Sequence, residues 1–213
     1  MYENIDITPF LTREYVFRHV KPRLYSKGYY DSFYGANRMF GKYLDMLVGY
    51  QVDVPELTTE DRNVSFPIML EQLDIIGTTV RELHDGAILN LENDELIVPL
   101  IDIIAQETDL PREILEEEDS GIILISNKKG LFGAVQILND SVISNIVERL
   151  GNRFFIIPSS VHEMLILPAE HCSNDLSELS DIVKDVNMDH VIPSERLSNS
   201  AYLYDEGEIT IIE

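Results

Sequence analysis

The sequence predicts an α+β protein with a mostly antiparallel sheet, helices on one side of it, and a helical region at the N-terminus. Three observations support this prediction. Hydrophobic residues make up 45% of the 213 residues, enough for a packed core. Short apolar runs between turn residues fill the C-terminal half and are typical of strands. Segments with apolar residues at helical spacing separate them.

We divide the chain into three parts: a basic, aromatic, helical head over residues 1–55, a mainly helical middle segment over 56–119, and an α+β domain over 120–213. In the head, Thr12 is the expected N-cap of a helix that Pro22 breaks or kinks. A second helix is expected over residues 37–49, where apolar side chains recur at helical spacing.

The middle segment predicts a helix over residues 67–83 that stops at residues 84–86. Residues 87–94 suggest a short strand and turn. Pro99 fits the first turn of a further helix, and residues 109–111 open another short one.

The C-terminal part carries the clearest signals. GIILISN, KKG and LFGAVQIL read as a β-hairpin. Asn139 is the expected N-cap of a helix that Gly151 ends. FFIIP and MLILP are expected strands, residues 177–186 a helix, and residues 201–213 a closing hairpin.

Charge is distributed unevenly. The formal net charge is −22, from 38 acids and 16 bases. Residues 1–50 hold seven bases, five acids and 12 of the 18 aromatic side chains, so residues 51–213 carry a net charge of −24. Such an acidic body favours solubility, and it would also suit a mimic of nucleic acid that occupies a basic channel of another protein.

The compartment follows from cysteine usage and hydropathy. A single cysteine, Cys172, excludes a disulfide framework and favours the cytoplasm. The N-terminal residues lack the pattern of a signal peptide, and no apolar run has the length of a membrane span. We therefore expect a soluble cytoplasmic protein without a membrane partner.

The head is the strongest candidate binding surface, because basic and aromatic side chains alternate in it. Tyrosine and arginine favour protein interfaces, so another protein ranks ahead of nucleic acid as partner. Alternatively, the head docks on the acidic body and its aromatic side chains belong to the core. The candidate binding residues are Arg13, Arg18, Arg23, Tyr29, Tyr30 and Arg38.

The segment FFIIPSSVHEMLILP places polar residues between two apolar runs. Ser159 or Ser160 with His162 and Glu163 has the composition of a hydrolase active site. Sequence neighbours make poor triad partners, however, so we favour a capping box in which Ser160 and Glu163 cap a single helical turn between two strands.

Metal and cofactor patterns do not emerge. His162 and Glu163 begin an H-E-x-x-H motif, but Ile166 occupies its second histidine position. Neither of the common glycine-rich phosphate-binding patterns occurs. The sequence therefore predicts no metal and no cofactor.

The C-terminal part resembles an uncharacterised bacterial domain family of unknown function, common in anaerobic gut Gram-positive bacteria and their mobile elements. The resemblance rests on SNKKGLFGAVQIL, FFIIPSSVHEMLILP, DIVKDVN and LSNSAYLYDEG in this order, over about residues 120–210. It implies a compact intracellular α+β domain and no particular activity.

Together these observations predict a non-enzymatic intracellular protein-interaction module with a regulatory or defence-related role. The alternatives are a hydrolase that uses the Ser/His/Glu cluster and a nucleic-acid-binding protein that uses the head. The oligomeric state does not follow from the sequence.

Overall fold

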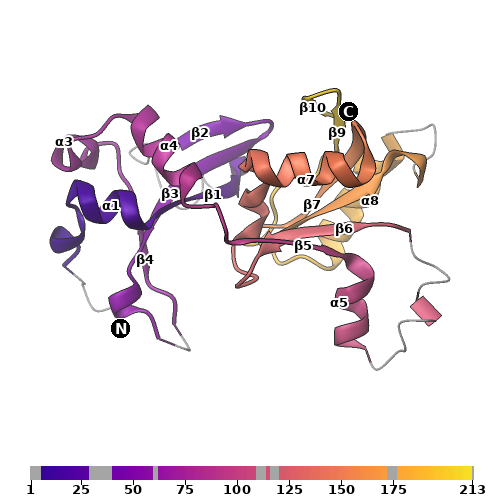
Figure 1. Ribbon diagram of the computed structural model, residues 1–213, viewed down its shortest axis with the longest axis horizontal. Helices are drawn as coiled ribbons and strands as arrows, with labels where there is room; N and C mark the ends of the chain where they lie inside the picture. Colours follow the sequence, from indigo (N-terminus) through magenta and orange to yellow (C-terminus); the bar gives the residue numbers. More distant parts are fainter. Residues whose placement is uncertain are drawn as a thin grey trace.

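A computed structural model describes residues 6–28, 40–59, 62–108, 114–115, 120–171 and 177–212. It confirms an α+β fold in which all strand pairs of two sheets are antiparallel. Figure 1 shows a smaller N-terminal lobe beside a larger C-terminal lobe. The expected short helix at residues 109–111 lies outside the described residues.

The N-terminal lobe is a four-stranded sheet covered by short helices. The strands have the order β1-β3-β2, and β4 also pairs with β3. The elements of this lobe are η1 (Thr8–Phe10), α1 (Arg13–His19), β1 (Val20–Ser26), β2 (Phe40–Tyr43), β3 (Met46–Asp53), η2 (Pro55–Leu57), β4 (Ser65–Pro67), α3 (Gln72–Ile76) and α4 (Val80–Leu89).

The C-terminal lobe is built on a six-stranded sheet with the order β10-β9-β7-β8-β6-β5. Its elements are β5 (Glu95–Pro99), α5 (Leu100–Glu107), β6 (Ile123–Asn127), η3 (Gly133–Leu138), α7 (Asp140–Leu150), β7 (Arg153–Ser160), β8 (Glu163–Pro168), η4 (Ala169–His171), α8 (Ser177–Asp189), β9 (Tyr202–Asp205) and β10 (Glu208–Ile211). Because β5 pairs with β6, the sheet begins in the middle segment, before residue 120.

The helix expected over residues 37–49 is wrong where the structure describes it. Phe40–Tyr43 and Met46–Asp53 form a hairpin, with Leu44 in the left-handed region at its turn. Met46, Val48, Tyr50 and Val52 are all buried, which is the period of two of a strand. Thr12 does cap α1, but Pro22 lies within β1, so in the described part of the head α1 leads directly into a strand of the small sheet.

The single helix expected over residues 67–83 is two helices. Gly77 ends α3 with a positive φ, and Thr79 begins α4 with a capping box to Glu82. Residues 84–86, the expected end of the helix, lie inside α4. Residues 87–94, the expected strand and turn, form the last part of α4 and the turn after it. Gly86 is required there because a Cβ atom would lie 2.8 Å from the Phe17 ring of α1.

Most predicted elements of the C-terminal lobe are confirmed: β6, α7 with its Asn139 cap, β7, β8, α8 and the β9–β10 hairpin. The predicted hairpin around KKG is wrong in its second half. Residues 133–138, which were expected to form the second strand, form the 3₁₀ helix η3. Phe132 before it has a φ of 56°, in the left-handed region, so the chain leaves the extended conformation that a second hairpin strand would need.

Helices cover both faces of the large sheet. Phe154 and Ile156 of β7 pack in the same cluster as Ile146 of α7, whereas Phe155 packs with Val183 of α8. The expectation of helices on one side is therefore corrected. Burial on both faces also explains why the FFII segment is a continuous apolar run rather than an alternating one.

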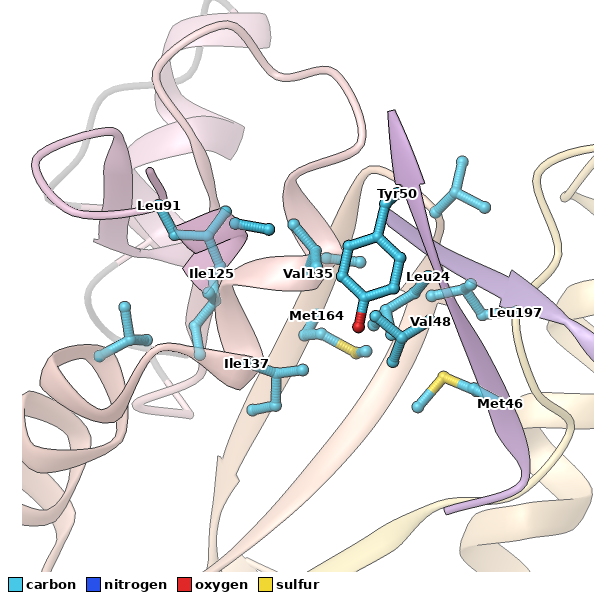
Figure 2. Close-up of a cluster of buried hydrophobic side chains, with 14 of the residues drawn as sticks. Leu24, Met46, Val48, Tyr50, Leu91, Ile125, Val135, Ile137, Met164 and Leu197 are labelled. Atoms are coloured by element: carbon cyan, nitrogen blue, oxygen red, sulfur yellow. The ribbon is translucent and has the colours of Figure 1, made fainter. Parts of the chain in front are cut away.

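One hydrophobic core joins the two lobes. Figure 2 shows Leu24, Met46, Val48 and Tyr50 of the small sheet facing Ile137 and Met164 of the large lobe. Asp45, at the tip of the β2–β3 hairpin, accepts hydrogen bonds from Ser198 Oγ and Tyr202 OH, both at 2.6 Å. Burial, together with this carboxylate, raises the pKa of Tyr202.

Candidate functional site

The polar segment Ser159–Glu163 is a tight β-hairpin, not a helical turn. Ser160 pairs with Glu163 across it, and Val161 and His162 form the turn. Ser160 Oγ accepts from the amide of His162 at 3.0 Å, and Ser159 Oγ donates to Glu163 Oε1 at 3.0 Å. The predicted capping box between Ser160 and Glu163 is therefore wrong, and each serine has another partner.

The turn is held by other parts of the chain. The amide of Val161 donates to the carbonyl of Glu195, and its carbonyl accepts from Ala134. Ser126 Oγ donates to the His162 carbonyl at 2.8 Å. These long-range hydrogen bonds satisfy backbone groups that burial would otherwise leave unpaired.

Both ring nitrogens of His162 are engaged. Nδ1 accepts from the amide of Phe132 at 3.1 Å, so in this arrangement the ring proton is on Nε2. Nε2 lies 3.4 Å from Glu195 Oε1. In this geometry the imidazole contacts the Phe132 amide and Glu195, not the two serines. Ser159 bonds Glu163, and Ser160 accepts from the His162 amide, so the serine and histidine side chains do not form the pair that a hydrolase needs.

The loop before η3 fits closely against this turn. Asn127 Oδ1 accepts from the amides of Lys129 and Leu131, and its Nδ2 donates to the Leu131 carbonyl. A Cβ atom on Gly133 would lie 2.4 Å from both Asn127 N and Ser126 Oγ. The close approach of η3 to β6 therefore requires a glycine.

Arg23 of β1 brings the small lobe to the same place. Its guanidinium lies 4.0 Å from the centre of the Phe132 ring, and that ring lies 5.4 Å from His162. Arg23 Nη2 also contacts Ser65 Oγ at 3.2 Å and Asp53 Oδ1 at 3.5 Å. A column of arginine, phenylalanine and histidine therefore crosses the boundary between the lobes.

A pocket of about 370 Å³ opens beside this column. We call it the arginine pocket. Its polar and aromatic lining comes from both lobes and includes Arg23, Tyr25, Gln51, Phe132, His162 and Arg196. The segment after α8 also contributes Glu195 and the exposed Ser194 to the lining.

A larger groove of about 1000 Å³ also lies between the lobes. We call it the interlobe groove. Its apolar lining includes Tyr43, Leu89, Ile137, Leu138, Ile143 and Ile209. Tyr50 OH lies 2.7 Å from His84 Nδ1 at this groove, and burial, with the charge of Asp85, raises the pKa of Tyr50 to about 12.

The predicted binding residues of the head separate in space. Arg13 docks where α3 ends and α4 begins: it donates to the carbonyl of Gly77, the C-cap of α3, and pairs with Glu82 of α4 at 3.1 Å. Arg18 is exposed on α1 beside Glu14. Arg23 lines the arginine pocket, and Tyr29, Tyr30 and Arg38 lie outside the described residues.

Bases of the head pair with acids of the body, as the docking alternative expected. Besides the pair of Arg13 with Glu82, Lys21 Nζ lies 2.6 Å from Asp94 Oδ2. Tyr15 OH donates to Glu56 at 2.5 Å, and burial with this contact raises the pKa of Tyr15 to about 12.

Sequence reasoning found Arg23 and His162 but missed Phe132, Glu195 and Arg196. Glu195 and Arg196 follow Pro193 in a segment without regular structure, and no motif marks them. Phe132 carried a detectable signal, because it precedes a glycine after the turn residues KKG.

Across the described ranges, no three His, Cys, Asp or Glu side chains gather as a metal site requires. Among the described helices, none has the length and apolar character needed to cross a membrane.

Fold and site define an α+β protein of two antiparallel sheets that share one core, with the arginine pocket and the interlobe groove at their boundary. The chain belongs to the family of unknown function DUF5688, whose model matches residues 17–206. The sequence resemblance covered only about residues 120–210. The family match is longer, because it begins at residue 17, within α1, and so includes the small sheet. Comparisons with curated proteins and with solved structures found no match.

Proposed function

We propose that this chain is a non-enzymatic, cytoplasmic protein-interaction module that binds a basic amphipathic segment of another protein in the interlobe groove. A regulatory or defence-related role in bacterial mobile elements is the setting we propose for this binding. The observation that carries the proposal is the apolar groove itself, which has exposed apolar side chains at its margin.

The lining of the groove suits an apolar helix face. Val80 and Leu89 of α4 line it while remaining 48% and 62% exposed. Exposed apolar side chains that gather at a groove are typical of a site that binds a partner. Grooves of this kind bind amphipathic helices through side chains spaced three and four residues apart.

The charge around the groove selects a basic partner. Asp85 and Asp140 line it, and the exposed Glu206 and Glu208 flank Gly207, which also lines it. Lys42 and Arg81 are the bases of the lining, and Arg81 lies 3.9 Å from Asp85. With a net charge of −22 on the whole chain, electrostatic attraction favours a basic segment and speeds its association.

The test measures binding of a fluorescently labelled amphipathic helix made of leucine and lysine, by fluorescence anisotropy. We expect saturable binding to the wild-type protein and binding at least tenfold weaker to Leu89→Asp. The matched control is Ile182→Asp, on α8 outside the groove, where the native side chain is 55% exposed. This variant should bind as the wild type does.

Leu89→Asp adds a negative charge, so it separates groove binding from general attraction between opposite charges. General attraction would leave binding unchanged or strengthen it in this variant, and either result contradicts the proposal. Equal binding of a scrambled peptide of the same composition, which has no apolar face, contradicts it as well.

A further inference from the structure

The structure assigns a second ligand site to this protein: we propose that the arginine pocket binds a small organic oxyanion, a carboxylate or a phosphate monoester. This site is separate from the interlobe groove. Successive residues of a strand point to opposite faces, and in β3 Tyr50 lines the groove whereas Gln51 lines the pocket. Neither proposal depends on the other.

The pocket has the size and position of a small-molecule site. Its volume of about 370 Å³ lies within the range of roughly 300–1,000 Å³ found for ligand pockets. Three parts of the fold form it: strands of the small sheet, the turns at Phe132 and His162, and the segment after α8. Pockets at such boundaries between structural units are common ligand sites.

The charge of the lining opposes the charge of the whole molecule. Among the described lining residues, Arg23 and Arg196 stand against one acid, Glu195, in a chain with a net charge of −22. Asp53, which contacts Arg23, lines a neighbouring hollow and is not among the residues that line this pocket. A local positive excess in a low-dielectric hollow attracts an anion.

Contacts within the protein hold both arginine side chains in place, which favours specific binding of an oxyanion over a diffuse cloud of counterions. Arg23 rests on the Phe132 ring, and Arg196 donates from Nε to the Val191 carbonyl at 2.8 Å and from Nη2 to the Met188 carbonyl at 3.3 Å. A guanidinium offers five donors in a planar fork that matches carboxylate and phosphate oxygens. Ordering the fork beforehand reduces the entropy lost on binding.

The remaining walls suit the organic part of such a ligand. Phe132, Val161 and Pro67 contribute apolar surface. Gln51 Nε2 donates to Tyr25 OH at 2.9 Å, so these two buried polar side chains form a fixed hydrogen-bonding wall. We therefore expect a compact ligand with one apolar or aromatic face and one oxyanion.

The experiment compares four probes of similar shape: benzoate, phenyl phosphate, neutral benzamide and cationic benzamidine. Titration is followed by amide chemical shifts of the full-length protein in NMR spectra. We expect benzoate or phenyl phosphate to bind at least tenfold more tightly than benzamide and to shift the amides of Phe132, His162 and Glu195. Whichever of the two binds more tightly identifies the carboxylate or the phosphate source.

The variant that tests the site is Ser194→Glu, which adds a carboxylate at an exposed position of the lining. It should weaken binding of the anionic probe at least tenfold, and the isosteric neutral control Ser194→Gln should change it less than twofold. Because residue 194 is exposed, both variants should fold normally. A further variant, Arg196→Gln, should also weaken anion binding, and Arg153→Gln, outside the pocket, should not.

Three results would overturn the proposal. The first is saturation by none of the four probes. The second is benzamidine binding as tightly as benzoate and phenyl phosphate. The third is an equal loss of affinity in Ser194→Glu and Ser194→Gln, which would show that the charge of the pocket does not select the ligand.

Discussion

Among the described glycines, Gly133 is the one where an added Cβ atom would meet its neighbours at the shortest distance. A side chain there would meet Asn127 N and Ser126 Oγ at 2.4 Å and the His162 carbonyl at 2.8 Å. Two of these atoms belong to the backbone and cannot rotate away. The contact of η3 with the β7–β8 turn, and with it the arginine pocket, therefore depends on the absence of a Cβ atom.

Gly133→Ala is expected to lower the free energy of unfolding by about 2 kcal/mol or more, as overpacking of a tight site does. Urea denaturation followed by circular dichroism measures this change. Gly41→Ala is the matched control, because a Cβ atom at Gly41 would meet its nearest neighbours at 3.8 Å. A loss of stability of the same size in both variants would contradict our account of Gly133.

At the scale of elements, α4 is tied to α1 through one carboxylate. Glu82 accepts from the Thr79 amide at 2.9 Å within the capping box and pairs with Arg13 at 3.1 Å. The Thr79 amide first, and then Arg13, lower the pKa of Glu82 to about 2. The start of α4 is therefore most stable when this carboxylate is ionised.

The sign of the pH dependence follows from the lowered pKa. The stabilisation by Glu82 is complete above its unfolded pKa of 4.5 and is lost as the pH falls through about 2. Glu82→Gln should therefore lower the urea midpoint at neutral pH, and its difference from the wild type should shrink below pH 4.5.

The control for this experiment is Glu71→Gln at the start of α3, where the side chain makes no capping hydrogen bond. Urea midpoints measured at several pH values should show no such trend for this variant. A constant difference between Glu82→Gln and the wild type across the acidic range would contradict the role assigned to the ionised carboxylate.

At the scale of the whole molecule, the two lobes share a core and a polar clamp at Asp45, so we expect them to unfold as one unit. Asp45 accepts from Ser198 and from Tyr202, whose side chain is almost fully buried. Loss of the carboxylate would leave two donors without their partner. Hydrogen bonds to charged groups contribute roughly 1.5–3 kcal/mol each.

Asp45→Ala is therefore expected to lower the free energy of unfolding by about 2 kcal/mol or more, with both lobes affected. Hydrogen exchange followed by mass spectrometry should show faster exchange in β3 and β9 together. Asp74→Ala, at an exposed position of α3, is the control and should change neither strand. Faster exchange confined to the small lobe would contradict the clamp.

Local signals in the sequence were sufficient for most of the large lobe. The Asn139 cap and Gly151 stop of α7 act within one helix, and the apolar runs of β7 and β8 need only a neighbouring strand. The same reasoning failed at residues 40–49, because large apolar residues in a short segment fit both a helical and an alternating pattern. Pairing of β3 with β1 and β2 decides between them.

The site shows the same division. The sequence by itself determined the acidic charge, the α+β class and the presence of polar side chains between two apolar strands. Only the tertiary structure decided that His162 faces Phe132 and Glu195, and that Arg23 reaches this place from the other lobe. The physical reason is distance along the chain: a cap or a turn is specified by adjacent residues, whereas these contacts depend on how separate elements pack.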